Sequence, residues 1–489
     1  MSGNFAPTGA ELLRFLPEIV LALAATFLMV LEPLTDRASK RALPVIALLG
    51  LVLAMFAALM AQAQPGTAFS DMIVVDGFAT FFRVLVIAIG ILTILISTNY
   101  LRQEGSEGGE YYALLLFSIT GQCIMATANE LVMLFIGLEA SSIATYIMAG
   151  YLRDDKRNNE SALKYFLLGS FATAFLLYGI AWAYGLTGST NLSRIREVLL
   201  SPSAAPDTLM ISLAAGLMFV GFAFKVSAAP FQMWAPDVYQ GAPAPVSGFM
   251  SAGPKAAAFA MLLRVFLTAF EPIKDRWEPV LWWSALATMI IGNFAALRQD
   301  NIKRLLAYSS IAHAGYIMVA VTAHSEIGTT AAMFYLAAYA VTNLGAFALV
   351  THVARHNERY VEVKDFAGLG QRQPVTAALL TVFLLSLIGV PLTAGFFGKF
   401  YIFRAALDSN LVWLTVLGLL NSALAAYYYL RIVVVMYMQP PSETEEDDLL
   451  PMSAGVQLTA WFAAVAIIVL GVYPSLVLDF AGRSAALLR

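Results

Sequence analysis

The segment Gly221–Val246 reads GFAFKVSAAPFQMWAPDVYQGAPAPV and decides how this chain must fold. It begins as a run of apolar residues that would suit a helix buried in a membrane. Yet it carries a lysine, Lys225, five residues before Pro230, and a WAPD turn follows. Proline removes a hydrogen bond from a helix, and a charge is costly in lipid. Either the segment lies outside a membrane, or the charge and the broken helix serve a function inside one.

The composition of the whole chain favours the membrane. Of its 489 residues, 60% are hydrophobic and 12% are charged, whereas a soluble domain carries about 25% charged residues. The net charge of −3 gives no basic field for nucleic acid. The single cysteine, Cys123, excludes a four-cysteine iron–sulfur site, and the sequence has no glycine-rich phosphate loop and no histidine spacing typical of a metal site. We therefore expect a polytopic membrane protein without a metal, redox centre or nucleotide site of its own.

About fourteen runs of the chain are long and apolar enough to cross a membrane, which takes about 20 residues each. The expected fold class is an all-α polytopic membrane protein with these runs as transmembrane helices. The expected spans are 12–33, 42–63, 75–98, 111–128, 130–151, 160–185, 209–238, 245–270, 279–297, 303–323, 327–353, 374–404, 410–438 and 454–477. A short helix on the membrane surface is expected at 191–201.

The loops between these runs differ in positive charge. One set (TDRASKR, LRQ, RDDKRNN, LRQDNIKR and ARHNERYVEVKDFAGLGQRQ) carries about 14 Lys and Arg residues, and the opposite set carries about 8. Lysine-rich and arginine-rich loops remain on the cytoplasmic side of a membrane. We therefore expect a multi-pass membrane protein with both termini on the outer side of the membrane.

Basic residues also fall inside the expected spans. Three arginines, Arg83, Arg264 and Arg431, lie within a few turns of a span end, and we expect their side chains to extend to the membrane surface. Three lysines lie near the middle of their runs, where an unpaired charge costs about 2.5–3.5 kcal/mol. These are Lys225, Lys255 and Lys399. Three lysines that each cost this much free energy in a membrane indicate a function.

Three further ionisable groups accompany these lysines. Glu139 is the only acidic residue near the middle of a span, and His313 is the only histidine at a comparable depth. Lys164 lies closer to a span end. Simpler roles exist for each group, because a glutamate can lock two helices and a buried histidine can be an ordinary hydrogen-bonded core residue. Taken together, they favour a row of titratable groups whose protonation responds to a neighbour's charge, as a proton relay requires.

The expected helix breaks coincide with two of the lysines. Pro230 follows Lys225 in the seventh span, and Pro391 and Gly395 precede Lys399 in the twelfth. In lipid, a broken helix is tolerated only where the freed backbone groups are buried in protein or line a hydrated cavity. Breaks at corresponding positions of two halves are typical of inverted-repeat transporters. The breaks are five spans apart, so spans 4–8 and 9–13 are expected to form two inverted five-helix repeats.

This pattern divides the chain into four segments without separate soluble domains. Residues 1–110 form an N-terminal three-helix segment, and residues 439–489 contain an acidic loop at 443–448 and a C-terminal helix. The first five-helix repeat occupies residues 111–270, and the second occupies residues 271–438.

The segment KVSAAPFQMWAPDVYQGAPAPVSGFMSAGPKAAAFAMLLR, residues 225–264, resembles the antiporter-like membrane subunits of respiratory complex I, the proton-pumping NADH–quinone oxidoreductase. The likeness is closest to the bacterial N-type subunits and covers nearly the whole chain. Sibling L-type and M-type subunits typically carry a histidine beside the WLPDA-like turn, where this chain has Gln232 and Met233. Supporting segments are GLEASSIATYIMAGY (137–151), ALKYFLLGSFATAFLLYG (162–179), RQDNIKRLLAYSSIAHAGYIMVA (298–320) and SLIGVPLTAGFFGKF (386–400).

The resemblance implies a role for each ionisable group. By this likeness, Glu139 and Lys225 form a charge pair, Lys255 is the central lysine, Lys399 is the lysine near the outlet, Lys164 is the lysine of the sixth span, and His313 is a connecting group. The resemblance also implies that this chain holds no cofactor, and that NADH, flavin, iron–sulfur clusters and quinone bind to other subunits. The implied partners are an M-type antiporter-like subunit, small K- and J-type subunits, the lateral helix of an L-type subunit, and lipids.

We therefore predict a proton-translocating membrane subunit of complex I, which is part of a translocase and moves protons coupled to quinone reduction elsewhere. Two alternatives remain at this point. A cation/proton antiporter subunit of the Mrp type would share the fold and the row of charges, but its transport would depend on sodium. A scaffold subunit would use its charges only to lock helices, and neutralising them would leave pumping normal.

Overall fold

The computed structural model describes residues 7–35, 39–203, 205–441 and 451–486. These ranges contain twenty α-helices, so the predicted all-α class is confirmed. The helices are α1 (Gly9–Arg14), α2 (Leu16–Leu31), α3 (Leu43–Gln62), α4 (Gly77–Gln103), α5 (Gly109–Thr127), α6 (Leu131–Ala149), α7 (Lys156–Thr187), α8 (Leu192–Leu200), α9 (Thr208–Val226), α10 (Trp234–Gly241), α11 (Ala244–Arg264), α12 (Lys274–Ala296), α13 (Ile302–Thr322), α14 (Glu326–Ala354), α15 (Leu369–Arg372), α16 (Pro374–Ile388), α17 (Ala394–Asp408), α18 (Val412–Met438), α19 (Ala454–Val472) and α20 (Ser475–Ala485).

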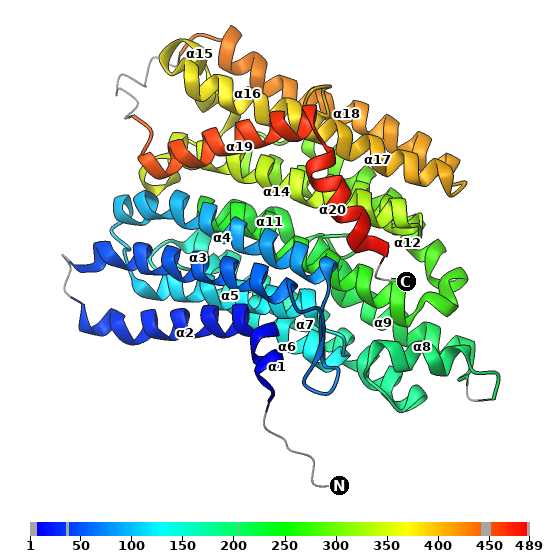
Figure 1. Ribbon diagram of the computed structural model, residues 1–489. Helices are drawn as coiled ribbons and strands as arrows, with labels where there is room; N and C mark the ends of the chain where they lie inside the picture. Colours follow the sequence, from blue (N-terminus) through cyan, green and yellow to red (C-terminus); the bar gives the residue numbers. More distant parts are fainter. Residues whose placement is uncertain (1–6, 36–38, 204, 442–450, 487–489) are drawn as a thin grey trace.

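The long helices lie side by side in a bundle, and α20 crosses it obliquely (Figure 1). Within the described ranges, twelve helices are long and apolar enough to span a membrane, which makes this a multi-pass membrane protein. Helix α5 occupies the predicted span 111–128, and α16 and α17 together occupy 374–404. The total of fourteen spans and the inverted repeats remain predictions, and the acidic loop at 443–448 lies outside the described residues.

The loops meet in two groups at opposite ends of the bundle. At the first end, which we call the basic end, the N–H of Asn357 donates to Glu104 at 2.7 Å, and Arg157 donates to the carbonyl of Asn357 at 3.2 Å. The loops that meet there follow α4, α6 and α14, and they belong to the set that is rich in Lys and Arg. This contact therefore brings the predicted cytoplasmic loops together.

The opposite end, which we call the hairpin end, carries the small sheet of the described chain. Strands β1 (Gly66–Ala68) and β2 (Ile73–Val75) pair antiparallel, with Thr67 opposite Val74. The side-chain amides of Asn129 and Asn191 both donate to the carbonyl of Asp71 in the hairpin turn. The helix expected at 191–201 is present there as α8, which buries Leu192 and Ile195 and leaves Leu200 exposed.

Helix α11 lies in the centre of the bundle, and each of its residues from Ala244 to Arg264 is buried. It packs against α4, α5 and α14. Its sequence is rich in Ala, Gly and Ser, and small residues let membrane helices approach closely. Because α11 carries Lys255, the fold places this lysine far from both lipid and bulk water.

The first helix break lies between α9 and α10 and contains Pro230. The backbone groups that the break frees at Ala229 are hydrogen-bonded to α12. The hydroxyl of Thr288 accepts from the N–H of Ala229 at 2.7 Å, and the hydroxyl of Ser284 donates to the carbonyl of Ala229 at 2.6 Å. The indole N–H of Trp234 closes the gap by donating to the carbonyl of Phe224 at 2.9 Å. The freed backbone groups of Ala229 and Phe224 are therefore hydrogen-bonded within the protein, although Pro230 and Met233 of the break are exposed on its surface.

The second break lies between α16 and α17 and contains Pro391. Helix α16 ends at Gly389, which adopts a left-handed conformation with a φ of 92°. Helix α17 then returns so close to α16 that a Cβ on Gly395 would lie 1.8 Å from the carbonyl oxygen of Ser386. Glycine is required at this position because any side chain would overlap the backbone of α16.

The expectation that the arginines extend to the membrane surface is wrong for two of them. Arg83 is fully buried and forms an ion pair with Glu18 on α2, with a shortest N–O distance of 2.7 Å. Arg264 is also buried and pairs with Asp76 at 3.0 Å. These carboxylates lie 65 and 188 residues away from their arginines, so sequence proximity gave no sign of them. The third residue, Arg431, pairs with Asp300 at the basic end and stays partly exposed.

Candidate functional site

The Lys225 side chain is buried beside the first helix break. It lies in the last turn of α9, where the carbonyl end of the helix favours a positive charge. The ammonium nitrogen lies 5.1 Å from the centre of the Tyr146 ring and 5.2 Å from that of Tyr165, so aromatic faces surround the cation. The ring of Tyr165 in turn stacks on Trp234 at 4.5 Å, which connects Lys225 to the WAPD turn.

Glu139 approaches Lys225 without forming an ion pair. It lies on α6, is partly buried, and is close enough to act electrostatically on Lys225. In the described part of the chain, no salt bridge joins the two residues, and the Oε1 atom of Glu139 has no hydrogen-bond partner. The resemblance implied a charge pair, and the geometry instead shows two neighbouring charges with a gap between them. A buried oxygen of this kind is a site for a bound water.

Lys255 occupies the middle of α11 and is 1% exposed. Its ammonium group donates to the carbonyl of Ser310 on α13 at 2.8 Å and also to the hydroxyl of the same residue. The ring of Tyr339 on α14 lies 6.0 Å from the nitrogen. Lys255 therefore joins the three helices that form the centre of the bundle.

His313 lies one turn beyond Ser310 on α13 and is held between two tyrosines. Its Nδ1 atom lies 2.5 Å from the hydroxyl of Tyr335, and its Nε2 atom lies 3.1 Å from the hydroxyl of Tyr429. The Tyr429 hydroxyl is also hydrogen-bonded to Ser309, the neighbour of Ser310. Hydroxyl and imidazole groups can both donate and accept hydrogen bonds, so the direction of donation along this series of hydrogen bonds can reverse.

Lys399 lies on α17 at the second break and has the most complete set of acceptors. Its ammonium donates to the carbonyls of Leu387 and Ile388 at 3.0 and 2.8 Å, and to the hydroxyl of Ser422 at 2.8 Å. The two carbonyls end α16, where a cation is favoured. The Tyr316 ring lies 5.0 Å from the nitrogen, and it also contacts His313 with ring centres 5.7 Å apart.

The structure thus buries five of the six predicted residues wholly or in part, and we call these five the row. Lys255, His313 and Lys399 are connected through Ser309, Ser310, Tyr316 and Tyr429, and Lys225 and Glu139 lie at the other break. Lys164 does not belong to this row. It is 40% exposed and pairs with Glu160 and Asp237 at 2.7 Å each.

Sequence reasoning missed the hydroxyl groups that connect the row. The tyrosines on α14 and α18 are distant in sequence from His313, and tyrosine is common in any membrane helix. One usable signal was present, because Tyr335 and Tyr339 are four residues apart and therefore lie on one face of α14. A second miss is Lys303, which was counted with a surface loop and is 1% exposed.

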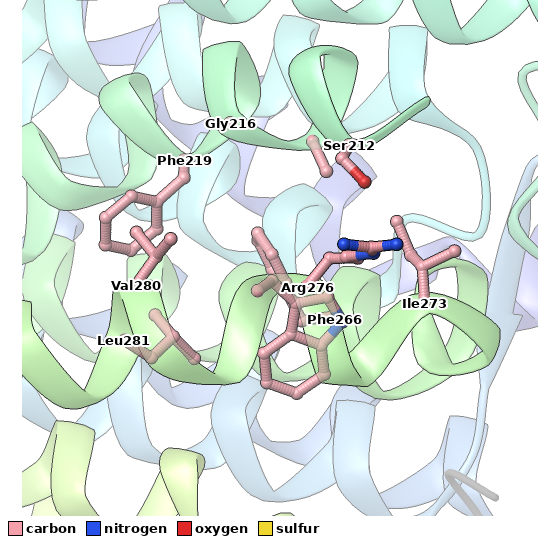
Figure 2. A pocket seen from close by; sticks show the side chains of 10 residues that line it. Ser212, Gly216, Phe219, Phe266, Ile273, Arg276, Val280 and Leu281 are labelled. Atoms are coloured by element: carbon pink, nitrogen blue, oxygen red, sulfur yellow. The ribbon is translucent and has the colours of Figure 1, made fainter. Parts of the chain in front are cut away.

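The ammonium, hydroxyl and imidazole groups of the row can each donate a hydrogen bond, and the hydroxyls and the neutral imidazole can also accept one. Within the described ranges, no group of three or more His, Cys, Asp or Glu residues is placed to hold a metal ion. A cavity of about 40 Å³ between α9 and α12, near Arg276, is lined mainly by apolar side chains (Figure 2). No member of the row lines this cavity, so it is separate from the site.

Comparison with known proteins finds close relatives over the full length. A family described as "NADH:quinone oxidoreductase/Mrp antiporter, TM" matches residues 128–425. NADH-quinone oxidoreductase subunit N 1 of Solibacter usitatus (strain Ellin6076) is 60% identical over 489 residues and covers all of both chains.

Two solved structures share the architecture. A chain of respiratory complex I from Thermus thermophilus with bound aureothin is 35% identical, with a TM-score of 0.81 and coverage of 95% of this chain and 99% of that chain. A chain of the Mrp complex from Dietzia sp. DQ12-45-1b has a TM-score of 0.85 and covers 97% of both chains. The Mrp chain is 18% identical, so it is similar in fold alone.

Proposed function

The chain belongs to the family of NADH-quinone oxidoreductase subunit N, the antiporter-like membrane subunits of complex I, and from this premise we propose that its buried lysine row is the path of the protons. The protein is a subunit of a translocase and works within a multi-subunit membrane complex. The sequence-based prediction of the family and of its function is thereby confirmed. The roles of individual residues form the proposal itself.

In this proposal, Lys255 is the central proton-carrying residue of the relay. A proton released from its ammonium passes to the Ser310 hydroxyl, and from there by Ser309 and Tyr429 to His313. Hydrogen bonds join Lys255 to Ser310, Ser309 to Tyr429 and Tyr429 to His313, while Ser309 and Ser310 are neighbours along α13, and these contacts support this step. Each hydroxyl accepts one proton and donates another, so no charge remains on the intermediate groups.

Lys399 receives the proton at the far end of the row and releases it toward the outlet. The break between α16 and α17 supports this role, because Lys399 binds backbone carbonyls that the break has freed. At the other break, Lys225 and Glu139 form a second loading site. The gap between them allows their interaction to change with small movements, and two unit charges 4 Å apart interact by about 4 kcal/mol at an effective dielectric of 20. A change of that size is enough to load or unload a proton.

We further propose the surroundings of the subunit. The NADH, flavin, iron–sulfur and quinone chemistry belongs to other subunits, and no cofactor binds here. An M-type antiporter-like subunit, small K- and J-type subunits, the lateral helix of an L-type subunit, and lipids are its neighbours. The basic end faces the cytoplasm of a bacterial inner membrane, and both termini lie on the periplasmic side, as the uneven charge of the loops supports.

The observation that carries the proposal is the hydrogen bonding of Lys255 to Ser310 in the fully buried centre. We therefore expect Lys255→Met to lower proton pumping at least about fivefold, which corresponds to about 1 kcal/mol. The measurement is NADH oxidation and the proton gradient in membrane vesicles, with the amount of assembled complex determined on native gels.

Lys364→Met is the matched control, because Lys364 is 76% exposed on a loop at the basic end. It should pump at the wild-type rate. Normal pumping by the Lys255 variant would favour the scaffold alternative, in which the charges only hold helices together. Sodium-dependent transport by the wild-type protein would favour the Mrp-type alternative, which the shared fold leaves open as a mechanism.

A further inference from the structure

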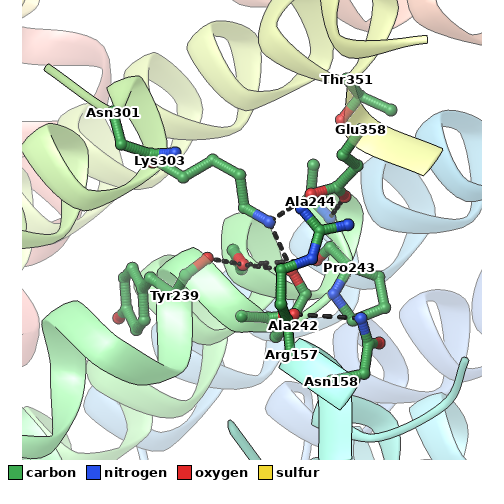
Figure 3. A network of polar contacts seen from close by, with 12 residues as sticks. Arg157, Asn158, Tyr239, Ala242, Pro243, Ala244, Asn301, Lys303, Thr351 and Glu358 are labelled. Carbon is green, nitrogen blue, oxygen red and sulfur yellow. Dashed lines mark hydrogen bonds and ion pairs between the residues drawn. The ribbon is translucent and has the colours of Figure 1, made fainter. Parts of the chain in front are cut away.

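A third buried ion pair lies at the basic end of the bundle and has no role in the relay described so far. Lys303, in the first turn of α13, contacts the Oε2 atom of Glu358 at 2.5 Å, and their side chains are 1% and 10% exposed. The Lys303 ammonium also donates to the carbonyl of Ala242. Figure 3 shows this pair where α10, α11 and α13 converge with the loop after α14.

Glu358 is bound by groups from three parts of the chain. Its Oε1 atom accepts from the N–H of Ala244, the first residue of α11, at 2.6 Å, and from the hydroxyl of Tyr100 on α4 at 2.9 Å. Glu358 itself has a left-handed φ of 46° and follows Asn357, whose φ is 58°. Such backbone conformations are costly for residues other than glycine and cluster at functional sites. The carboxylate therefore closes the end of the central helix at the basic end.

The outer side of Glu358 faces water-accessible space. It lines a cavity of about 590 Å³ together with Glu104, Asp155 and Arg157. It also lines a second, open cavity of about 770 Å³ together with His356. Both cavities lie at the basic end. Glu358 therefore borders water-accessible space, its side chain is 10% exposed, and its carboxylate is bound to the Lys303 ammonium.

The charged groups around Glu358 come from every element packed on it. Lys303 belongs to α13, Arg157 to α7, and Tyr100 and Glu104 to the end of α4. Burial holds the pKa of the Glu104 carboxyl above its ordinary value, although the Asn357 N–H and His356 favour its charged form. Burial acts in the same sense on Asp155, but hydrogen bonds from Arg157 keep the pKa of Asp155 below its ordinary value. Glu358 is thus surrounded by one carboxyl group with a raised pKa, Glu104, and one with a lowered pKa, Asp155.

A stripe of polar side chains leads from this pair to Lys255. On α11, Ser247, Ser251 and Lys255 are spaced four residues apart and share one face. On α13, Lys303 and Ser310 are seven residues apart and share the facing side, since seven residues are about two turns. The distance along α11 from Ala244 to Lys255 is about 16 Å at 1.5 Å per residue.

An unpaired polar atom borders the same stripe. Asn343 on α14 donates to the hydroxyl of Ser251 at 2.5 Å, but its Oδ1 atom has no partner in the described chain. The hydroxyls of Tyr239 and Tyr339 also lie at this stripe, close to Ser310. Buried polar atoms that lack a protein partner are places where water binds. The stripe can therefore conduct protons through alternating side chains and waters.

We propose that the Glu358–Lys303 pair is the proton inlet of the subunit, and that protons from the basic end pass from it along α11, α13 and α14 to Lys255. A proton from cavity water first forms an O–H bond with the Glu358 carboxylate and neutralises it. The proton then leaves Glu358 for the stripe and finally forms an N–H bond on neutral Lys255. Glu358, again a carboxylate, restores its contact with Lys303. This inlet rests on the proposed relay through Lys255.

The test is Glu358→Gln in assembled complex I, measured in inside-out vesicles in which the basic end faces the medium. Glutamine keeps the shape of the side chain and its oxygen acceptor, but it cannot take up a proton. We expect pumping per assembled complex to fall at least about fivefold, and its dependence on the pH of the medium to change from that of the wild type. Glu358→Asp retains an ionisable group and should keep part of the rate and a pH dependence like that of the wild type.

Glu362→Gln is the matched control, because Glu362 is 48% exposed four residues further along the same loop and pairs with Lys364. Lys255→Met in the same vesicles separates the two proposals. If Glu358→Gln pumps at the wild-type rate while Lys255→Met does not, the inlet is wrong and the relay stands. If Lys255→Met also pumps normally, the relay itself has failed. Two results would show that the pair is structural and that the inlet proposal is wrong. The first is a lower amount of complex with an unchanged pumping rate per complex and an unchanged pH profile. The second is loss of assembly in both Glu358 variants.

Discussion

At the scale of single residues, the lysines of the row differ in how many hydrogen-bond acceptors hold each ammonium group. Lys399 binds three acceptors and Lys255 binds two, whereas Lys225 contacts only aromatic faces among the described residues. A cation on an aromatic face is worth about 0.5–2 kcal/mol, and such a contact has no fixed donor direction. Lys225 is therefore the member of the row whose ammonium is most free to move.

This difference predicts a result for Lys225→Arg. The guanidinium keeps the positive charge and stacks well on Tyr146 and Tyr165, but it is effectively never deprotonated. We expect an assembled complex whose proton pumping falls at least about fivefold, measured as the dye-reported gradient per NADH oxidised. Lys164→Arg should leave pumping unchanged, because Lys164 is partly exposed and its contacts with Glu160 and Asp237 need only a charge. Full pumping by the Lys225 variant would mean that Lys225 is a fixed charge.

The sequence could predict which residues matter here, but not what they touch. Lys225, Lys255 and Lys399 were identified because charges are rare in apolar runs, and this signal is local. Their partners, such as Ser310 and Ser422, come from other helices and are ordinary polar residues. The same limit explains the error on Arg83, whose partner Glu18 lies on another helix and resembles a residue at a helix end.

At the scale of helices, the two breaks are positions where local sequence dictated the structure. Proline and glycine limit the backbone directly, so the breaks at Pro230 and Pro391 could be expected from the sequence. The elements that stabilise the breaks could not be expected. The first break is stabilised by hydroxyls on α12, and the second by the close approach of α17 to α16.

The close approach at the second break predicts a strong effect of Gly395→Ala. The new Cβ would overlap the carbonyl of Ser386, and overpacking typically costs about 1–3 kcal/mol even where side chains can move. We expect a clearly lower midpoint of thermal denaturation for the purified complex, or loss of assembly on native gels. Gly216→Ala is the control, because a Cβ there meets nothing within 4 Å and alanine stabilises a helix by about 0.5–1 kcal/mol. Equal stability of both variants would contradict the packing of α16 on α17.

At the scale of the whole molecule, the basic end and the hairpin end define an orientation that can be tested. We expect Lys364→Cys to react with a membrane-impermeant maleimide only after the membrane is opened, and Asn410→Cys to react in intact spheroplasts. The loop at Lys364 belongs to the basic set, and Asn410 lies between α17 and α18 at the other end. The only cysteine of the natural sequence, Cys123, is buried and should remain unlabelled in both experiments. Labelling of the two variants in the reverse order would invert the proposed orientation.

During synthesis, α11 leaves the ribosome before the helices that later surround it. At that moment Ser310 has not yet been made, and Lys255 faces the membrane without its acceptor. A lysine at the centre of an inserting helix costs about 2.5–3.5 kcal/mol, and the serines and glycines of α11 offset little of this. The hydrogen bonds that stabilise the buried Lys255 therefore form only after α13 has been made. A chain that ends before α13 would therefore hold Lys255 in the membrane without the acceptors of Ser310.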